Sequence, residues 1–213
     1  MEINRDYAVD VKNVMLVKHK KKQIILAHTS STLEEFFNKL KTRCNGKYDK
    51  IPTYVISLEG VVYELFDPNF NVNFMEDESI DKISISIVLE NQGWLTKDPF
   101  EPNYYDWKSN AYNEGVIEKS WRNKKYWASY GDEQMINLVE LIGVLGSEFN
   151  ISKDFVGDNT SIHKPKTFKG IINRSNYTKN YYDLSPAFDF NKFNELIQKQ
   201  QKNDTNNNSN ENS

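Results

Sequence analysis

The sequence predicts one α/β domain in which helices flank a central mixed β-sheet. Two short apolar runs, QIILAH (23–28) and SISIVLEN (84–91), have the length and composition of buried strands. Apolar residues recur at helical spacing over 33–44 and again over 135–149. Strands that alternate with amphipathic helices are typical of a sheet covered by helices. A length of 213 residues suits one such domain.

The expected elements follow the order β-α-β-β-β-α-β-α. Thr32 and Glu35 match a capping box at the start of the first helix, and Asn45-Gly46 is a typical helix end. Glu59-Gly60 is a turn between two β-rich runs, which predicts a hairpin. The expected ranges are 23–28, 32–44, 52–58, 61–66, 84–91, 132–149, 154–157 and a last helix from about 189.

Two segments lie outside this pattern. Residues 94–130 are rich in Trp, Tyr and Asn and show no clear periodicity, so we expect a long irregular insertion. Such a segment is unusual in a compact domain and is more often functional than idle. Residues 202–213 contain no apolar residue, which predicts a disordered Asn-rich tail after a folded domain of residues 1–201.

The composition excludes several classes of protein. Lys and Arg number 27 against 30 Asp and Glu, and this near balance argues against a general nucleic-acid binder. The one basic cluster, KHKKK (18–22), is typical of a solvated edge. No apolar window approaches the ~18 residues of a membrane span, and the first residues lack the apolar core of a signal peptide. Cys44 is the only cysteine, so no intrachain disulfide can form.

Five residues could carry chemistry. His28 ends a predicted buried strand, where side chains of an α/β sheet meet a cleft, although a hydrogen-bonded core histidine also explains it. Glu90 also ends a strand and is either exposed there or held as a general base. Asp158 and Asp183 stand in turn-forming sequence, which is an ordinary place for Asp. His163, in an expected loop, is either inert or a stand-in ligand.

The order of these motifs is more specific than any one of them. A strand ending in His-Thr is followed by a hairpin with Tyr-Val-Ile, a strand ending in Leu-Glu-Asn, a Val-Gly pair and DLSPAFDF. This order resembles the N-acetylmuramoyl-L-alanine amidase family, whose fold is shared with peptidoglycan-recognition proteins. The resemblance covers about residues 20–200. SISIVLENQGWL, RNKKYW, GIINRSNY and DLSPAFDF look like segments of the version encoded by large tailed phages.

The resemblance implies zinc-dependent hydrolysis of the amide between N-acetylmuramic acid and L-alanine. In the family, two histidines and an Asp or Cys hold the zinc and leave one position open for water. By position, His28 matches the first histidine and Asp183 the final ligand. Glu90 matches the acid that moves the proton of the attacking water, and Tyr54 matches a tyrosine that lines the cleft.

Two positions depart from the family pattern. Asp158 stands where the second histidine is expected, and three interpretations remain open: Asp158 ligates the zinc, His163 replaces the imidazole, or the metal is lost. Tyr181 stands where the family often has a lysine for the developing oxyanion. Arg174 and Lys179 are the candidates to replace that lysine.

The sequence therefore supports two functions. One is a zinc amidase, acting as a phage lysin or as a virion-associated cell-wall hydrolase, with His28, Asp158 and Asp183 as metal ligands. The other is an inactive module of the same fold that binds peptidoglycan or other virion proteins. Arg174, Lys179 and Trp94 are expected to contact the substrate. We expect synthesis in the cytoplasm of the producing cell, with a holin or a phage particle providing the route to the wall.

Overall fold

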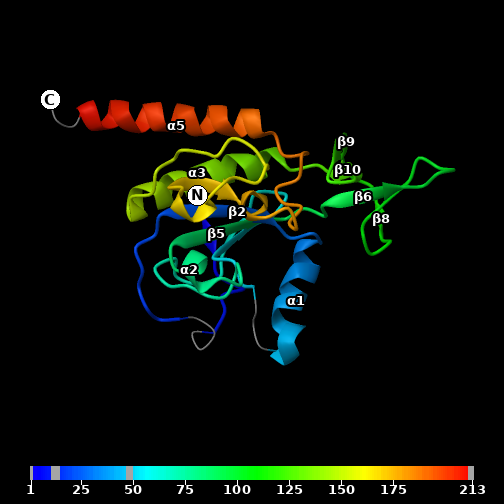
Figure 1. The fold of residues 1–213 in the computed structure, drawn as a ribbon, viewed down its shortest axis with the longest axis horizontal. Helices are drawn as coiled ribbons and strands as arrows, with labels where there is room; N and C mark the ends of the chain where they lie inside the picture. Colours follow the sequence, from blue (N-terminus) through cyan, green and yellow to red (C-terminus); the bar gives the residue numbers. More distant parts are fainter. Residues whose placement is uncertain (1, 11–14, 47–49, 211–213) are drawn as a thin grey trace.

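A computed structural model describes residues 2–10, 15–46 and 50–210, and within them the strands form two sheets. The main sheet has the order β1-β4-β3-β5-β2-β11, and the second sheet has the order β8-β7-β6-β10-β9 (Figure 1). The strands are β1 (Ile3–Asn4), β2 (Gln23–His28), β3 (Tyr54–Ile56), β4 (Val62–Glu64), β5 (Ser84–Leu89), β6 (Trp94–Lys97), β7 (Tyr104–Tyr105), β8 (Ala111–Tyr112), β9 (Val116–Trp121), β10 (Lys124–Ala128) and β11 (Gly170–Asn173). The helices are α1 (Leu33–Gly46), α2 (Glu78–Asp81), α3 (Asp132–Phe149), α4 (Arg174–Tyr177) and α5 (Phe190–Asn210).

The main sheet is mixed, as the sequence predicts. Strands β11, β2, β5 and β3 run parallel to one another, whereas β3 and β4 form the expected antiparallel hairpin. All six residues of β2 and all six of β5 are buried. Strands buried on both faces read as continuous apolar runs, which is why these two were recognisable.

Helices cover both faces of this sheet. Alternate residues of β2, Ile24 and Leu26, pack in one cluster with α3 and α5. Ile25 and Ala27 point to the opposite face and pack with Ile80 of α2. Helix α1 packs on that same side of the sheet, apart from α2 (Figure 1). The fold is thus the predicted single α/β domain with a central sheet between helices.

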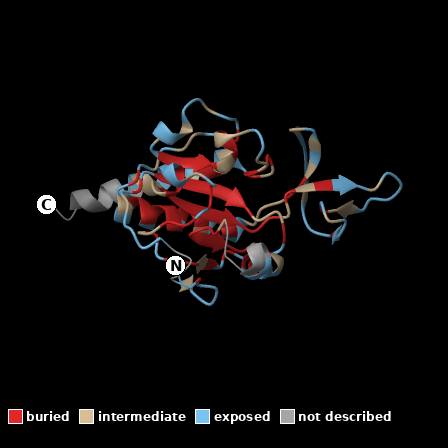
Figure 2. Ribbon diagram, turned by 60° about the horizontal axis from the view of Figure 1, so that its bottom comes forward, coloured by how far each residue is buried: buried red, intermediate tan, exposed pale blue. Residues whose placement is uncertain are grey.

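The second sheet corrects the expectation of an irregular insertion over residues 94–130. It projects from one end of the main body, and fewer of its residues are buried (Figures 1 and 2). Its strands escaped sequence analysis because β7 and β8 have two residues each and β9 is mostly exposed. The turn between β9 and β10 uses Arg122 and Asn123 at positive φ, in place of the Asn-Gly or Asp-Gly signal of such turns.

Two further elements differ from the expected ones. Residues 154–157 were expected to form a strand, but only Phe155 makes a bridge, and its partner is Ile171 of β11. The strand that joins the sheet is β11, which is absent from the elements that the sequence predicts. Helix α5 continues to Asn210, past the expected domain end at residue 201. Extending a helix that is already packed costs little, because nucleation is the expensive step.

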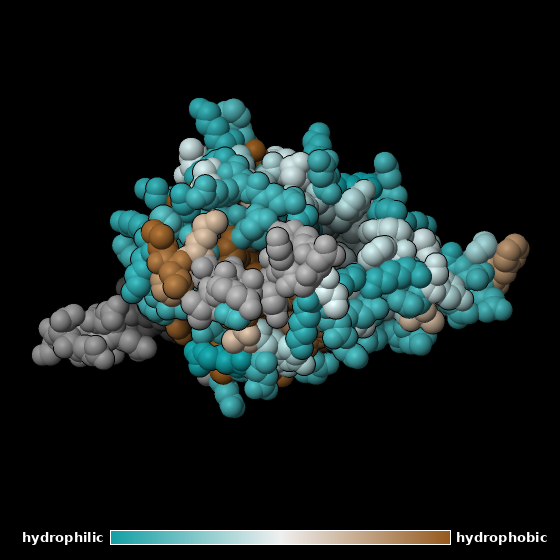
Figure 3. All heavy atoms as spheres, turned by 90° about the horizontal axis from the view of Figure 1, so that it is seen from below, coloured by the Kyte–Doolittle hydropathy of each residue, from teal (hydrophilic) through white to brown (hydrophobic). Residues whose placement is uncertain are grey.

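The surface of the α1 and α2 side is mostly hydrophilic, with hydrophobic atoms in small separate groups (Figure 3). No helix in the described ranges combines the length and the apolar character that crossing a membrane requires.

The β3–β4 turn allows a matched test of packing. Gly60 and Gly157 both have positive φ, but a Cβ on Gly60 would lie 2.7 Å from Asn137 Nδ2, whereas one on Gly157 would meet nothing within 4 Å. We expect Gly157→Ala to lower the free energy of unfolding by about 1 kcal/mol, from backbone strain alone. Gly60→Ala should cost about 3 kcal/mol because the clash adds to that strain. Urea unfolding of both variants measures the difference. Equal losses of unfolding free energy would show that the β3–β4 turn is not in close contact with α3.

Candidate functional site

The carboxyl ends of three parallel strands meet at one edge of the main sheet. His28, the last residue of β2, is in register with Leu89, so Glu90 follows immediately beside it. On the other side of β2, Asn173 ends β11 and Arg174 follows. Ligands of α/β sheets bind at the carboxyl ends of the strands, so this edge is the candidate site.

His28 is buried and hydrogen-bonded. Its Nδ1 lies 2.9 Å from the hydroxyl of Tyr130, which also accepts a hydrogen bond from the backbone N–H of Ser185 at 3.3 Å. Burial lowers the pKa of His28 to about 4, and the nearby Asp183 carboxylate opposes that shift. The imidazole is therefore neutral at pH 7. Its Nε2 side faces Gly93, where an added Cβ would lie 3.4 Å away.

Asp183 is paired with Arg174 by two hydrogen bonds. The Arg174 Nε donates to one carboxylate oxygen at 2.8 Å, and Nη2 donates to the other at 3.0 Å. Asp183 is only 2% exposed, so this is a buried ion pair. Its main chain is held too, because the backbone N–H of Ser175 donates to the Asp183 carbonyl at 2.9 Å.

Glu90 joins two elements by its carboxylate. One oxygen accepts the backbone N–H of Leu33, at the start of α1, at 2.7 Å. The other accepts the backbone N–H of Leu58, after β3, at 3.1 Å. Burial raises the pKa of the Glu90 carboxyl, and these two donors oppose the shift. One carboxylate oxygen of Glu90 therefore caps the start of α1, and the other holds the segment that follows β3.

The other expected site residues lie apart from these three. Asp158 is exposed, and its carboxylate accepts from the backbone N–H of Thr160 at 2.8 Å and from the Thr160 hydroxyl. This is the turn-forming contact that its sequence context also suggested. His163 is exposed on a loop. Tyr54 lies in the core, where its hydroxyl donates to Glu64 at 3.1 Å.

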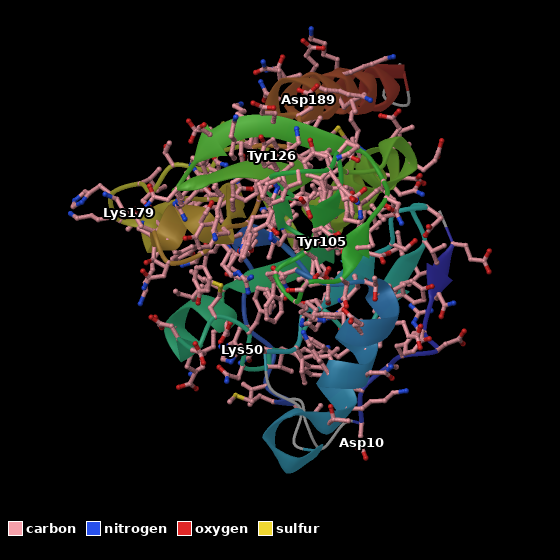
Figure 4. All side chains as sticks on the ribbon, turned by 90° about the vertical axis from the view of Figure 1, so that its right-hand side faces the viewer. Asp10, Lys50, Tyr105, Tyr126, Lys179 and Asp189 are labelled. Atoms are coloured by element: carbon pink, nitrogen blue, oxygen red, sulfur yellow. The ribbon has the colours of Figure 1, made fainter. Side chains whose placement is uncertain are left out.

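The expected substrate contacts are divided between two regions. Arg174 is at the edge, as described, whereas Lys179 is exposed and points outward from the body (Figure 4). Trp94 lies in β6 of the second sheet, where the Lys124 ammonium sits 3.3 Å from the centre of its ring. The catalytic, ligand and contact roles of all these residues stay predictions.

These contacts do not fit a three-ligand zinc site. Across residues 2–10, 15–46 and 50–210, no group of three or more His, Cys, Asp or Glu side chains is placed to hold a metal ion. His28 and Asp183 are close enough to interact electrically, but a guanidinium already occupies both oxygens of Asp183. The Asp158 carboxylate is engaged with Thr160 in its own loop.

Two residues of the site were missed by sequence analysis. Tyr130 holds His28, and its only sequence signal is its place just before Gly131, the N-cap of α3. Arg122 belongs to the quoted RNKKYW segment but was given no role. Its guanidinium donates to the backbone carbonyls of Tyr181 and, at 3.1 Å, Lys179, so the second sheet is attached to the loop that precedes Asp183.

The structure is similar to solved peptidoglycan amidases. LysCS, an endolysin N-acetylmuramoyl-L-alanine amidase from Clostridium intestinale, matches with a TM-score of 0.55 and 11% identity over 92% of this chain and 95% of its own. AmiD from E. coli, in complex with anhydro-N-acetylmuramic acid-L-Ala-D-γ-Glu-L-Lys, matches with a TM-score of 0.54 and 12% identity. The match covers 85% of this chain and 59% of AmiD. AMPDH3 from Pseudomonas aeruginosa, in complex with an anhydromuramic pentapeptide, matches with a TM-score of 0.52 and 11% identity. The match covers 85% of this chain and 62% of AMPDH3.

The chain thus spans about 59% of the length of AmiD, and identities this low establish the fold alone. No protein-family model and no curated protein matches the sequence. The expected resemblance is confirmed at the level of the fold, which is that of the N-acetylmuramoyl-L-alanine amidases.

The hydrogen bonds of Tyr130 give a prediction for the site. Tyr130→Phe removes the partner of both His28 Nδ1 and the Ser185 N–H, and we expect a loss of about 2 kcal/mol of unfolding free energy. Tyr104→Phe is the control, because the described contacts of this β7 residue are made by its ring. Urea unfolding measures both variants. A Tyr130→Phe loss no larger than the control would mean that the Tyr130 hydroxyl does not hold His28.

Proposed function

We propose that this amidase-fold chain binds the muramoyl-peptide part of peptidoglycan beside the strand-end edge that carries His28. The observation that carries the proposal is a groove of about 570 Å³ between the second sheet and the main body. Its volume lies within the range of small-molecule sites. It is lined by Ile117 and Lys119 of β9, by Gly157 and Asp158, and by residues 186–191.

Hydrogen bonds connect the segments that line the groove to the residues around His28. The carbonyl of Asp158 accepts the side-chain amide of Asn173, the last residue of β11, at 2.8 Å. Pro186 follows Ser185, whose backbone N–H donates to the Tyr130 hydroxyl that contacts His28. A ligand in the groove would therefore contact segments that are fixed to the strand ends.

The residues that line the groove suit a ligand that carries both positive and negative charges. Lys119, Asp158 and Asp189 are exposed, and each carboxylate uses one oxygen, Oδ1, for hydrogen bonds within its own segment. The lining also includes the apolar side chains of Ile117 and the half-buried Phe190. A stem peptide presents carboxylate and amine groups on a short, partly apolar backbone. The muropeptide complexes of AmiD and AMPDH3, which share the fold, support this class of ligand.

A substitution in the groove tests the proposal. Ile117 is 41% exposed on β9 and lines the groove, whereas Ile136 is 47% exposed on α3 and does not line it. We expect Ile117→Asn to weaken binding of a soluble anhydromuramoyl tripeptide about 10-fold, because burying such a side chain contributes about 1.5 kcal/mol or more. Ile136→Asn should bind like the unmodified chain. Isothermal titration calorimetry measures both, and no binding by the unmodified chain at millimolar peptide contradicts the proposal.

Zinc-dependent hydrolysis of the muramoyl–L-alanine amide is the second candidate. The observation in its favour is that His28, Glu90 and Asp183 gather at one edge. For it to operate, Arg174 would have to release Asp183 and a third ligand would have to reach the metal. Among the ligands that the family resemblance implies, Asp158 would have to be this third one, but its carboxylate is hydrogen-bonded to Thr160 in its own loop.

Product release separates the two candidates. Under the binding proposal we expect the chain to pull down with insoluble peptidoglycan and to release no stem peptide, with or without added zinc. Chromatography of the soluble fraction measures released peptide. Zinc-stimulated release that Glu90→Gln abolishes would instead establish hydrolysis and assign the proton-transfer role to Glu90.

The proposed ligand implies action at a cell wall. We propose delivery from the cytoplasm of the producing cell, either as a phage lysin or as a virion part that contacts other virion proteins. The similarity to the endolysin LysCS supports the phage context.

A further inference from the structure

Arg174 lies at the strand-end edge that also carries His28 and Asp183. It is the first residue after β11, and β11 runs parallel beside β2, whose last residue is His28. Its side chain is 17% exposed and Asp183 is 2% exposed, so the pair is largely removed from water. An uncompensated carboxylate at this depth would be costly, so the fold needs a cation next to Asp183.

The guanidinium meets that need in a fixed geometry. Nε and Nη2 each donate to a different oxygen of Asp183, at 2.8 and 3.0 Å, which is the two-point contact that favours Arg over Lys. The guanidinium carbon also lies 4.5 Å from the centre of the Tyr181 ring and 5.5 Å from that of Phe74. Aromatic contacts of this kind hold a cation in place.

The main chains of both partners are fixed as well. The Ser175 N–H donates to the Asp183 carbonyl, and Arg122 of the second sheet donates to the carbonyl of Tyr181. Arg174 and Asp183 are therefore placed by backbone contacts that do not depend on the ion pair itself.

From this arrangement we infer that the Arg174 guanidinium is the permanent cation of the site and takes the place at Asp183 that the family resemblance assigns to zinc. A zinc ion at Asp183 would have to displace the guanidinium, and the buried Arg174 charge would then lose its partner. With Asp183 engaged, His28 is the one remaining ligand of the expected set at this edge. The Arg174–Asp183 pair therefore keeps the residues of this edge in place without a metal ion.

Zinc content and thermal unfolding test the inference together. We expect the purified chain, equilibrated with equimolar zinc and passed over a desalting column, to retain no stoichiometric zinc by elemental analysis. Its melting temperature should be the same with zinc and with EDTA. About one zinc per chain, lost in Asp183→Asn, would overturn the inference.

Variants of the pair test the role of Arg174. Arg174→Met leaves the Asp183 carboxylate buried without its cation, and we expect the melting temperature to fall by roughly 10 °C. The double variant Arg174→Met with Asp183→Asn should recover more than half of that loss, because no uncompensated charge remains. Arg5→Met is the control, since Arg5 pairs with Glu64 while its own side chain is 62% exposed, and we expect a shift of about 2 °C or less.

Losses that simply add in the double variant would also overturn the inference, because they would show that the two charges are not coupled. If the variants fail to fold, the zinc content of the unmodified chain decides alone. The result is independent of the proposed ligand: a zinc-free chain that fails to bind muropeptide would contradict the proposed function, and a zinc-loaded chain that binds it would contradict only this inference.

Discussion

The parallel pairing of β2 with β5 and β11 is the constraint on which the rest of the site depends. The register aligns His28 with Leu89 and Leu26 with Asn173, so β2 and β5 end side by side and β11 ends two residues earlier at the same edge of the sheet. A shift of one residue in any of these pairings would turn the side chains that follow to the opposite face of the sheet. The continuous burial of β2 and β5 specifies the register, since both faces pack against helices. The position of His28 beside Glu90 and Arg174 is thus a consequence of core packing.

The residues at this edge hold the fold together as well as offering chemistry. The Glu90 carboxylate joins the start of α1 to the segment after β3, and Gln134 of α3 donates to the carbonyls of Ile56 and Glu90 at 3.0 Å each. Asn91 continues the same role towards the second sheet, because its amide donates to the carbonyls of Ala128 and Ser129. A carboxylate engaged by two backbone donors is a poor candidate for free proton transfer. The Leu-Glu-Asn motif therefore has a structural explanation that does not require catalysis.

Sequence reasoning was reliable where burial leaves a periodic pattern. It identified β2 and β5 from their continuous apolar runs, the β3–β4 hairpin from its β-rich runs and turn, and the helices α1 and α3 from their helical apolar spacing. It missed the second sheet, whose β9 (VIEKSW) is mostly exposed on both faces and so lacks alternation. It also placed a strand at 154–157 and not at 170–173, since both are short apolar runs next to turn residues. For the site, motif order singled out His28, Glu90 and Asp183, and Arg174 was named as a candidate to replace the family's lysine; the structure brings these residues to one edge, and their roles stay predictions. Sequence reasoning could not foresee that Arg174 pairs with Asp183, because eight residues of short helix and loop lie between them and only the folded loop brings the two side chains together.

The second sheet contacts the loop that precedes Asp183. Arg122 donates to two of its carbonyls and stacks 4.2 Å from the centre of the Trp121 ring, while Trp121 in turn contacts Tyr182. On the opposite side, the indole N–H of Trp107 donates to the carbonyl of Ser30 at 2.7 Å, just after His28. The sheet thus contacts both segments that flank the strand ends. Removing it would free the backbone next to Asp183 as well as the segment after His28, so the Trp- and Tyr-rich region belongs to the site and is not a separate appendage.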